Sequence, residues 1–410
     1  MKQLYERCAG MDVHKKTVTV CAVTPEKTET ITFLTMTGHL EKMAEWLEEL
    51  GIRHVAMEST GVYWKPLYNL LESRECGFEI VLVNAHHVKH VPGRKTDVKD
   101  AEWLAQLMQH GLLTASYVPS REQRELRELV RYRRSLIEEQ TREVNRIQKV
   151  LEGANIKLGD VATDVLGKSG RAMLTAMVNG EDDSAVLADM ARGRLRNKLE
   201  QLTEALHGVM GEHQRMILKI QLERIASLES HIEALDQEVA ERMRPFDKLI
   251  ARLDDIPGVG RRTCEEILAE IGIDMSRFPT SRNLASWAGM CPGNNASAGK
   301  RKSGKRAPGN PHLRRALIQA AHAAARTRNT YLSALFRRIS SRRGAKRAAV
   351  AVGHSILVTI YHMINDGSVY DEMGAAYLDS LNEKNTVRKA VKRLESLGYT
   401  VSLKHSTEMA

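Results

Sequence analysis

Four carboxylates in the first hundred residues have the types and positions of a divalent-cation site. Asp12 ends the first predicted strand and Glu58 ends the fourth. Asp97 and Asp100 lie three positions apart at the start of an amphipathic segment, so both can share one face of a helix. Mg²⁺ prefers oxygen ligands, and two such ions can activate a nucleophile and stabilise the leaving oxygen of a phosphodiester. Taken singly, each carboxylate can equally be a solvated surface group.

A serine in the second half of the chain lies beside a cationic cluster. Ser297 is followed within nine positions by five cations: Lys300, Arg301, Lys302, Lys305 and Arg306. A serine hydroxyl is a weak nucleophile unless a base or a metal activates it, and no acidic residue is near it in the sequence. Metal held by the distant carboxylates can supply that activation while the cations neutralise phosphate charge. The alternatives are a loop serine that only hydrogen-bonds phosphate, and Ser303 as the reactive hydroxyl.

The serine lies in a long basic window. Residues 275–365, between Asp274 and Asp366, are 91 consecutive positions with 17 Lys or Arg and no Asp or Glu, although the whole chain has 51 acids in 410 residues. A lysine or arginine that neutralises a phosphate also releases condensed counterions. The window therefore predicts a surface for polyphosphate, to which Arg314 and Arg315 contribute.

Composition narrows the class of protein. The formal net charge of +10 favours an anionic partner. The five cysteines are scattered without a CxxC pair, which argues against a disulfide framework and a structural zinc site and fits a reducing cytoplasm. We expect a cytoplasmic protein with no membrane partner, because the N-terminus lacks a signal-peptide core and no run approaches 18 apolar residues.

The elements that must position the carboxylates follow one another in residues 1–118. Strand-like runs cover residues 7–13, 17–23, 28–33, 54–58 and 78–83. Helix-like patterns stand after the third and fourth runs. Three strands, a helix, a strand, a helix and a strand predict an α/β domain in which helices cover a mixed sheet.

The remainder of the chain is predicted to be mainly helical. Residues 119–250 form a long helical or coiled-coil region, in which the apolar spacing of residues 225–239 is typical either of packing within the chain or of a dimer seam. Residues 251–368 form a basic, mainly α domain, and residues 369–410 a helical tail. The turn at Ile256–Gly260 resembles a helix-hairpin-helix turn, whose glycine amides can approach phosphate; a plain helical corner is the alternative.

Several motifs together resemble the DEDD transposases of the insertion-sequence 110/1111 family. The acidic motifs are GMDVHK at Gly10–Lys15, ESTGVY at Glu58–Tyr63 and KTDVKDA at Lys95–Ala101. The second set is IPGVG at Ile256–Gly260, LASWAGMCPG at Leu284–Gly293, SAGKRKSG at Ser297–Gly304 and GNPHLRRAL at Gly309–Leu317. Both sets stand in the family's order, and the segment around Ser297 is closest to the 1111 branch.

The resemblance implies a fold and a mechanism. It implies a ribonuclease-H-like, resolvase-like N-terminal domain in which Asp12, Glu58, Asp97 and Asp100 bind Mg²⁺. It also implies that Ser297 attacks DNA to form a covalent phosphoserine, and Ser303 departs from that family position. A homodimer or homotetramer and a structured non-coding guide RNA that pairs with donor and target DNA are further implications.

We therefore expect a transposase that mobilises an insertion sequence by Mg²⁺-dependent strand cleavage and exchange. One rival is a metal-dependent, structure-selective nuclease that uses the four carboxylates with water as nucleophile. The other is a non-catalytic nucleic-acid-binding derivative of a transposase.

Overall fold

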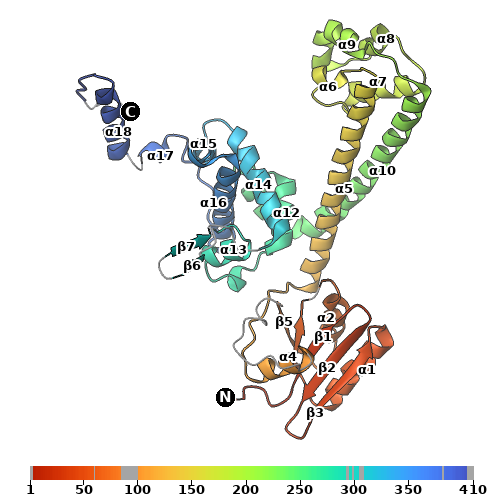
Figure 1. Ribbon diagram of the computed structural model, residues 1–410, viewed down its shortest axis with the longest axis vertical. Coiled ribbons are helices and arrows are strands. Elements are labelled where there is room, and N and C mark those ends of the chain that lie inside the picture. Colours follow the sequence, from red (N-terminus) through yellow and green to blue (C-terminus); the bar gives the residue numbers. More distant parts are fainter. Residues whose placement is uncertain are drawn as a thin grey trace. The chain divides into compact units, whose positions relative to one another are not determined.

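The chain consists of two units, each with its own hydrophobic core. The computed structural model describes residues 3–59, 61–84, 100–291, 295–297, 300–303, 309–380 and 383–403. For the short strands between residues 295 and 303 it describes the backbone alone. The N-terminal unit is Met1–Arg121 and the C-terminal unit is Glu122–Ala410 (Figure 1).

In the N-terminal unit, the described strands form one mixed sheet in the order β3-β2-β1-β4-β5. Its strands are β1 (Cys8–Val13), β2 (Thr17–Val23), β3 (Thr28–Leu34), β4 (His54–Glu58) and β5 (Glu79–Val83), and its helices are α1 (Thr37–Glu49), α2 (Trp64–Glu72) and α4 (Asp100–Gln109). β2 is antiparallel to β1 and β3, whereas β4 is parallel to β1 and β5. The predicted mixed α/β sheet and its element order are confirmed.

Both faces of this sheet are covered because alternate residues of each strand are apolar on opposite sides. Met11 and Val13 of β1 belong to a buried cluster with residues of α1 and α2. Cys8, on the other face, belongs to a second cluster with Ala101 and Ala105 of α4. The sheet therefore lies between α1 and α2 on one side and α4 on the other.

Helix α4 lies directly on β1 because residue 10 is glycine. A Cβ atom at Gly10 would stand 2.3 Å from the carbonyl oxygen of Ala101 and 2.3 Å from the amide nitrogen of Ala105. Atoms cannot approach so closely, so any side chain here would push the helix off the sheet.

The C-terminal unit is a long helical hairpin with a small helical tip at one end and a bundle at the other. The hairpin is formed by α5 (Arg121–Gly153) and α10 (Glu212–Met243). The tip contains α6 (Leu158–Val161), α7 (Lys168–Val178), α8 (Ser184–Asp189), η1 (Gly193–Lys198) and α9 (Leu199–Leu206). The bundle and tail contain η2 (Arg244–Phe246), α11 (Asp247–Asp254), α12 (Arg261–Ile271), η3 (Met275–Arg277), α13 (Ser281–Trp287), β6 (Asn295–Ser297), β7 (Lys300–Ser303), α14 (Pro311–Arg326), α15 (Tyr331–Arg343), α16 (Ala345–Asn365), α17 (Tyr377–Ser380) and α18 (Glu383–Ser396).

The predicted apolar seam of residues 225–239 is used inside the chain. Leu228 and Ile232 of α10 are buried in one cluster with Leu136 of α5, and Ile225 is buried with the tip. The structure thus favours packing within the chain over a dimer seam for these positions, because α5 and the tip already cover them. The tip packs its own core onto both helices of the hairpin through Ile147 and Leu218.

Helix α16 is the central helix of the bundle, where α13, α14 and α15 contact it. It is long and apolar enough to cross a membrane by length and composition, with half of its apolar window buried inside the protein. Polar residues such as His354, Ser355 and Thr359 interrupt this run, which is why the sequence predicts no membrane span here. Buried residues such as Val352 and Ile356 make it a core helix.

Replacing Gly10 by alanine tests the contact between β1 and α4. We expect Gly10→Ala to lower the free energy of unfolding by about 1–3 kcal/mol, because the added methyl group overpacks the contact. Urea unfolding followed by circular dichroism measures this. Gly38→Ala in α1 is the matched control, because a Cβ there meets nothing within 4 Å. Equal stability of the two variants would contradict the close approach.

Candidate active site

Asp12 and Glu58 occupy neighbouring positions at the carboxyl ends of two parallel strands. Met11 of β1 pairs with Met57 of β4, so the next residues along both strands are Asp12 and Glu58. Both lie on the sheet face that α4 covers, because alternate residues of a strand share a face and Ala56, two residues before Glu58, packs with α4.

Helix α4 brings a third carboxylate to the same end of the sheet. The helix runs antiparallel to β1: the Gln109 carbonyl accepts the backbone N–H of Leu4, at 2.8 Å, and Ala101 stands over Gly10. Continuing that direction by one residue leads to Asp100, at the start of α4, beside the end of β1 where Asp12 lies. The sequence predicts only that Asp100 lies on a helix, and the contact of α4 with Gly10 places the start of that helix beside the end of β1.

This donor set is suited to a hard cation. Asp12, Glu58 and Asp100 offer carboxylate oxygens, the ligand type that Mg²⁺ prefers. Asp97 lies outside the described residues. Within the part of the chain that is described, no group of three or more His, Cys, Asp or Glu side chains is close enough to hold a metal.

The Asp12 carboxylate has a close neighbour, His14, that is not among the predicted site residues. His14 Nε2 lies 3.1 Å from Asp12 Oδ2. The signal for this contact is the spacing of two residues at the end of a strand, which places both side chains on one face. His14 can thus hold the carboxylate in position.

Ser297 ends a short antiparallel ribbon in the C-terminal unit. It is the last residue of β6 and pairs with Lys300 of β7, and only two residues separate them in the sequence. Arg301 and Lys302 are also in β7, whereas Lys305 and Arg306 lie outside the described residues. A ribbon was not predicted here. The arrangement brings the serine backbone beside the first of the predicted phosphate-binding residues.

Two glycines bring together the ends of the segment that carries Ser297. A Cβ at Gly309 would stand 2.3 Å from the amide nitrogen of Gly289, so these backbones are in direct contact. The chain therefore leaves the bundle after α13 and returns at the same place. Asn310, the next residue, caps α14: its Oδ1 accepts the backbone N–H groups of His312 and Leu313, at 3.0 and 3.2 Å.

A buried glutamate of α12 fixes the point where this segment leaves and rejoins the bundle. Glu270 is 2% exposed, and its Oε2 accepts Asn310 Nδ2 at 2.6 Å. Arg131 of α5 donates to both Glu270 carboxylate oxygens, at 2.7 and 2.8 Å. Burial by itself raises the pKa of the Glu270 carboxyl, but the hydrogen bonds and charge of Arg131, with the bond from Asn310, outweigh it and lower that pKa.

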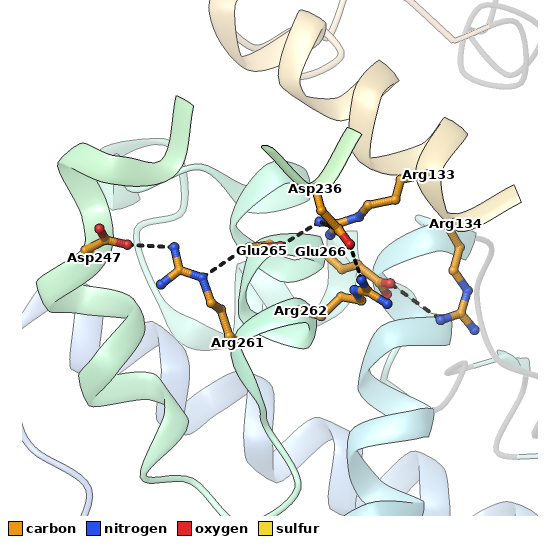
Figure 2. A network of polar contacts seen from close by, with 8 residues as sticks. All are labelled: Arg133, Arg134, Asp236, Asp247, Arg261, Arg262, Glu265 and Glu266. Carbon is orange, nitrogen blue, oxygen red and sulfur yellow. Dashed lines mark hydrogen bonds and ion pairs between the residues drawn. The ribbon is translucent and has the colours of Figure 1, made fainter. Parts of the chain in front are cut away.

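More ion pairs join α5 and α10 to α12, as Figure 2 shows. Arg133 is 1% exposed and its Nη1 contacts Asp236 Oδ1 at 2.9 Å and Glu265 Oε2 at 2.8 Å. Arg134 Nη1 lies 3.5 Å from Glu266 Oε1, and burial raises the pKa of that carboxyl. These acids are thus occupied in structural pairs that bind the hairpin to the bundle.

The turn at Ile256–Gly260 connects α11 and α12. Gly258 has a φ of +86°, and a Cβ there would stand 2.3 Å from the carbonyl oxygen of Ala320 in α14. This glycine is therefore required for packing. Gly260 is exposed at the start of α12, so it is the position of this turn that a phosphate can approach.

The two predicted arginines of α14 differ in their surroundings. Arg315 is exposed and its Nη1 lies 2.6 Å from Glu138 Oε1 of α5. An exposed pair of this kind contributes about 0–1 kcal/mol, so phosphate can compete for the guanidinium. Arg314 is half-buried.

The chain is similar to known transposases over most of its length. A family model described as "Transposase", for the DEDD enzymes of IS110 elements, matches residues 9–156, and one described as "Transposase IS116/IS110/IS902 family" matches residues 250–337. A probable family 20 transposase of Pseudomonas aeruginosa is 26% identical over 327 residues, which cover 77% of this chain and 85% of that protein. The transposase for insertion sequence element IS1111A of Coxiella burnetii is 23% identical over 299 residues, covering 72% and 73%.

These likenesses define the protein as an insertion-sequence transposase, an enzyme that acts on DNA. Asp12, Glu58 and Asp100 lie within the first matched range, and Ser297 within the second. The chain belongs to the IS110 family of transposases.

Removing the charge of Glu270 tests the contacts that hold the two ends of the Ser297 segment. We expect Glu270→Gln to lower the free energy of unfolding by about 3 kcal/mol at neutral pH, because a buried pair loses one charge. The folded-state pKa of Glu270 is lowered, so its contribution is full above the unfolded carboxyl pKa of about 4.3. It is lost as the pH falls through the folded-state value.

Urea unfolding at several pH values measures this difference. Glu138→Gln is the matched control, since Glu138 is 38% exposed and its loss should cost at most about 1 kcal/mol. A Glu270→Gln penalty that stays constant into the acid range, or that equals the control, would contradict the buried-pair account.

Proposed function

We propose that this transposase cuts and rejoins DNA through a covalent bond between Ser297 and a scissile phosphate, with Mg²⁺ held by Asp12, Glu58, Asp97 and Asp100. The observation that carries the proposal is the strand register that makes Asp12 and Glu58 neighbours. The N-terminal unit is then ribonuclease-H-like. Residues 1–118 then supply the carboxylates, and residues 119–250 form the helical linker. Residues 251–368 supply the serine and the cations, and residues 369–410 form a tail.

The chemistry requires one activated oxygen and one leaving oxygen. The Ser297 Oγ forms a bond to phosphorus, the bond from phosphorus to a deoxyribose oxygen breaks, and the serine proton passes to the released oxygen. A hydroxyl of another strand can then attack the phosphoserine and restore the serine. When bound, Mg²⁺ stabilises charge on the phosphate oxygens and favours the ionised nucleophile.

The cations of the ribbon stabilise the same phosphate. Lys300, Arg301 and Lys302 carry fixed positive charge beside the Ser297 backbone, and such groups are most effective where charge develops in the transition state. Because the phosphoserine retains the bond energy, strand exchange needs no nucleotide cofactor.

The expected partners follow the same proposal. DNA ends of the element and target DNA are the substrates, and a structured RNA from the element guides their pairing. The active form is a homodimer or homotetramer in the cytoplasm. Sedimentation equilibrium of the protein–DNA complex tests the oligomeric state, and the mass of a monomer would contradict it.

Omitting the RNA tests its role as a guide, because the transposase should then no longer select its target.

The variant that tests the nucleophile is Ser297→Ala. The full chain is incubated with element DNA, Mg²⁺ and the flanking RNA transcript, and protein covalently bound to DNA is measured on a denaturing gel. We expect Ser297→Ala to reduce the adduct by about a thousandfold or more, because the attacking oxygen is gone. Asp12→Ala should give a comparable loss, whereas Ser303→Ala, in the same ribbon, should retain most of the adduct.

The outcomes separate the rival functions. Cleavage that survives Ser297→Ala but is lost in Asp12→Ala would show a nuclease that uses water. DNA binding without cleavage by the unaltered chain would show a non-catalytic binding protein. Loss of the adduct in Ser303→Ala alone would move the nucleophile to Ser303.

A further inference from the structure

A second basic site lies on the helical tip, far along the chain from the carboxylates and the serine. Between the loop before α7 and η1 is an open cavity of about 580 Å³. Its lining includes four cationic side chains: Lys168, Arg192, Arg194 and Lys198. The tip lies between the two ranges that match transposase families, and neither the acidic site nor the serine ribbon uses it.

The cations of this cavity are available to a ligand. Lys168, Arg192 and Arg194 are exposed, and within the described residues none of the three forms an ion pair with a carboxylate. Other arginines nearby are committed: Arg196 pairs with Asp189 at 3.0 Å. Among the lining residues the acid is Asp164, whose Oδ1 accepts the backbone N–H of Leu166 at 3.0 Å. The cavity therefore has a net positive charge.

The two segments that carry the cations are tied together by a buried hydroxyl. The Ser169 Oγ accepts the backbone N–H of Arg192 at 2.9 Å, and Ser169 is 9% exposed. This bond holds η1 against the first turn of α7. Lys198 Nζ contacts the carbonyl oxygen of Val161 at 3.4 Å, which joins the end of η1 to the opposite wall.

Backbone groups add to the positive potential. Helix α7 has 11 residues, and Gly167 at its N-cap offers no side-chain cap. The first turn of an uncapped helix presents backbone N–H groups and the positive end of the helix dipole. Gly170 lets the preceding loop wrap tightly over this turn, since a Cβ there would stand 2.1 Å from the carbonyl oxygen of Val165. Gly167, Lys168 and Ser169 all line the cavity.

We propose that this cavity docks the phosphodiester backbone of nucleic acid, as a contact separate from the cleavage site. Several cations spread around an open cavity of this size suit successive phosphates of a chain better than one small anion. Contacts of this kind position a nucleic acid without reading its sequence. The proposal goes beyond the proposed function and requires neither Ser297 nor the carboxylates.

The test uses binding without cleavage. Ser297→Ala protein without Mg²⁺ is titrated into labelled random-sequence duplex DNA and, in a second arm, into an RNA hairpin, at several salt concentrations. Fluorescence anisotropy gives the dissociation constant. Adding Arg192→Ala and Arg194→Ala should weaken binding about tenfold and make the dependence of log K on log salt shallower by about two. Lys168→Ala, on the other segment, should make that slope shallower by about one.

The matched control removes two exposed lysines of the hairpin, Lys149→Ala with Lys219→Ala, which changes the net charge equally. Thermal unfolding by circular dichroism verifies that each variant is folded. Weakening in both arms supports a general phosphate contact, and weakening in one arm alone identifies DNA or RNA as the ligand. Dissociation constants and salt slopes equal to those of the control in both arms would overturn the proposal. Because cleavage is not measured, this result is independent of the fate of Ser297 as nucleophile.

Discussion

Charge segregation is the constraint on which this chain depends. A carboxylate in contact with an arginine has less charge to offer a metal, and the arginine has less charge to offer a phosphate. The metal-binding candidates Asp12, Glu58 and Asp100 lie in the N-terminal unit, whereas residues 275–365 of the C-terminal unit contain no acid. Some acids and arginines of the C-terminal unit, such as Glu265 and Arg133, are buried in structural pairs.

A second buried ion pair, with the hydrogen bonds around it, holds the two ends of the Ser297 segment. Arg131 of the long hairpin binds Glu270, Glu270 binds Asn310, and Asn310 caps α14 next to the Gly289–Gly309 contact. One continuous set of hydrogen bonds therefore runs from α5 to the point where the Ser297 segment leaves and rejoins the bundle. An active site needs such support, because a nucleophile is effective only when its geometry is fixed before the reaction.

The local sequence predicts the strands of the sheet well, but it does not predict which residues of different strands become neighbours. The bounds of β2 and β4 follow from short runs rich in apolar and β-branched residues, and the structure has the same bounds. That Asp12 and Glu58 are neighbours depends on the parallel pairing of β1 with β4, which no local pattern encodes. The β6–β7 ribbon was missed because its residues are polar and cationic and show no apolar alternation. The tip was missed because its short helices are stabilised by packing on the hairpin.

Peptide mapping of the protein–DNA adduct is the most direct test of the account, since it identifies the attacking atom. The adduct is digested with nuclease and protease, and mass spectrometry locates the residue that keeps the nucleotide. The account predicts a nucleotide phosphate on Ser297, formed by the unaltered chain and not by the Asp12→Ala variant. A phosphate on any other residue, or an adduct at Ser297 that forms equally well without the Asp12 carboxylate, would contradict it.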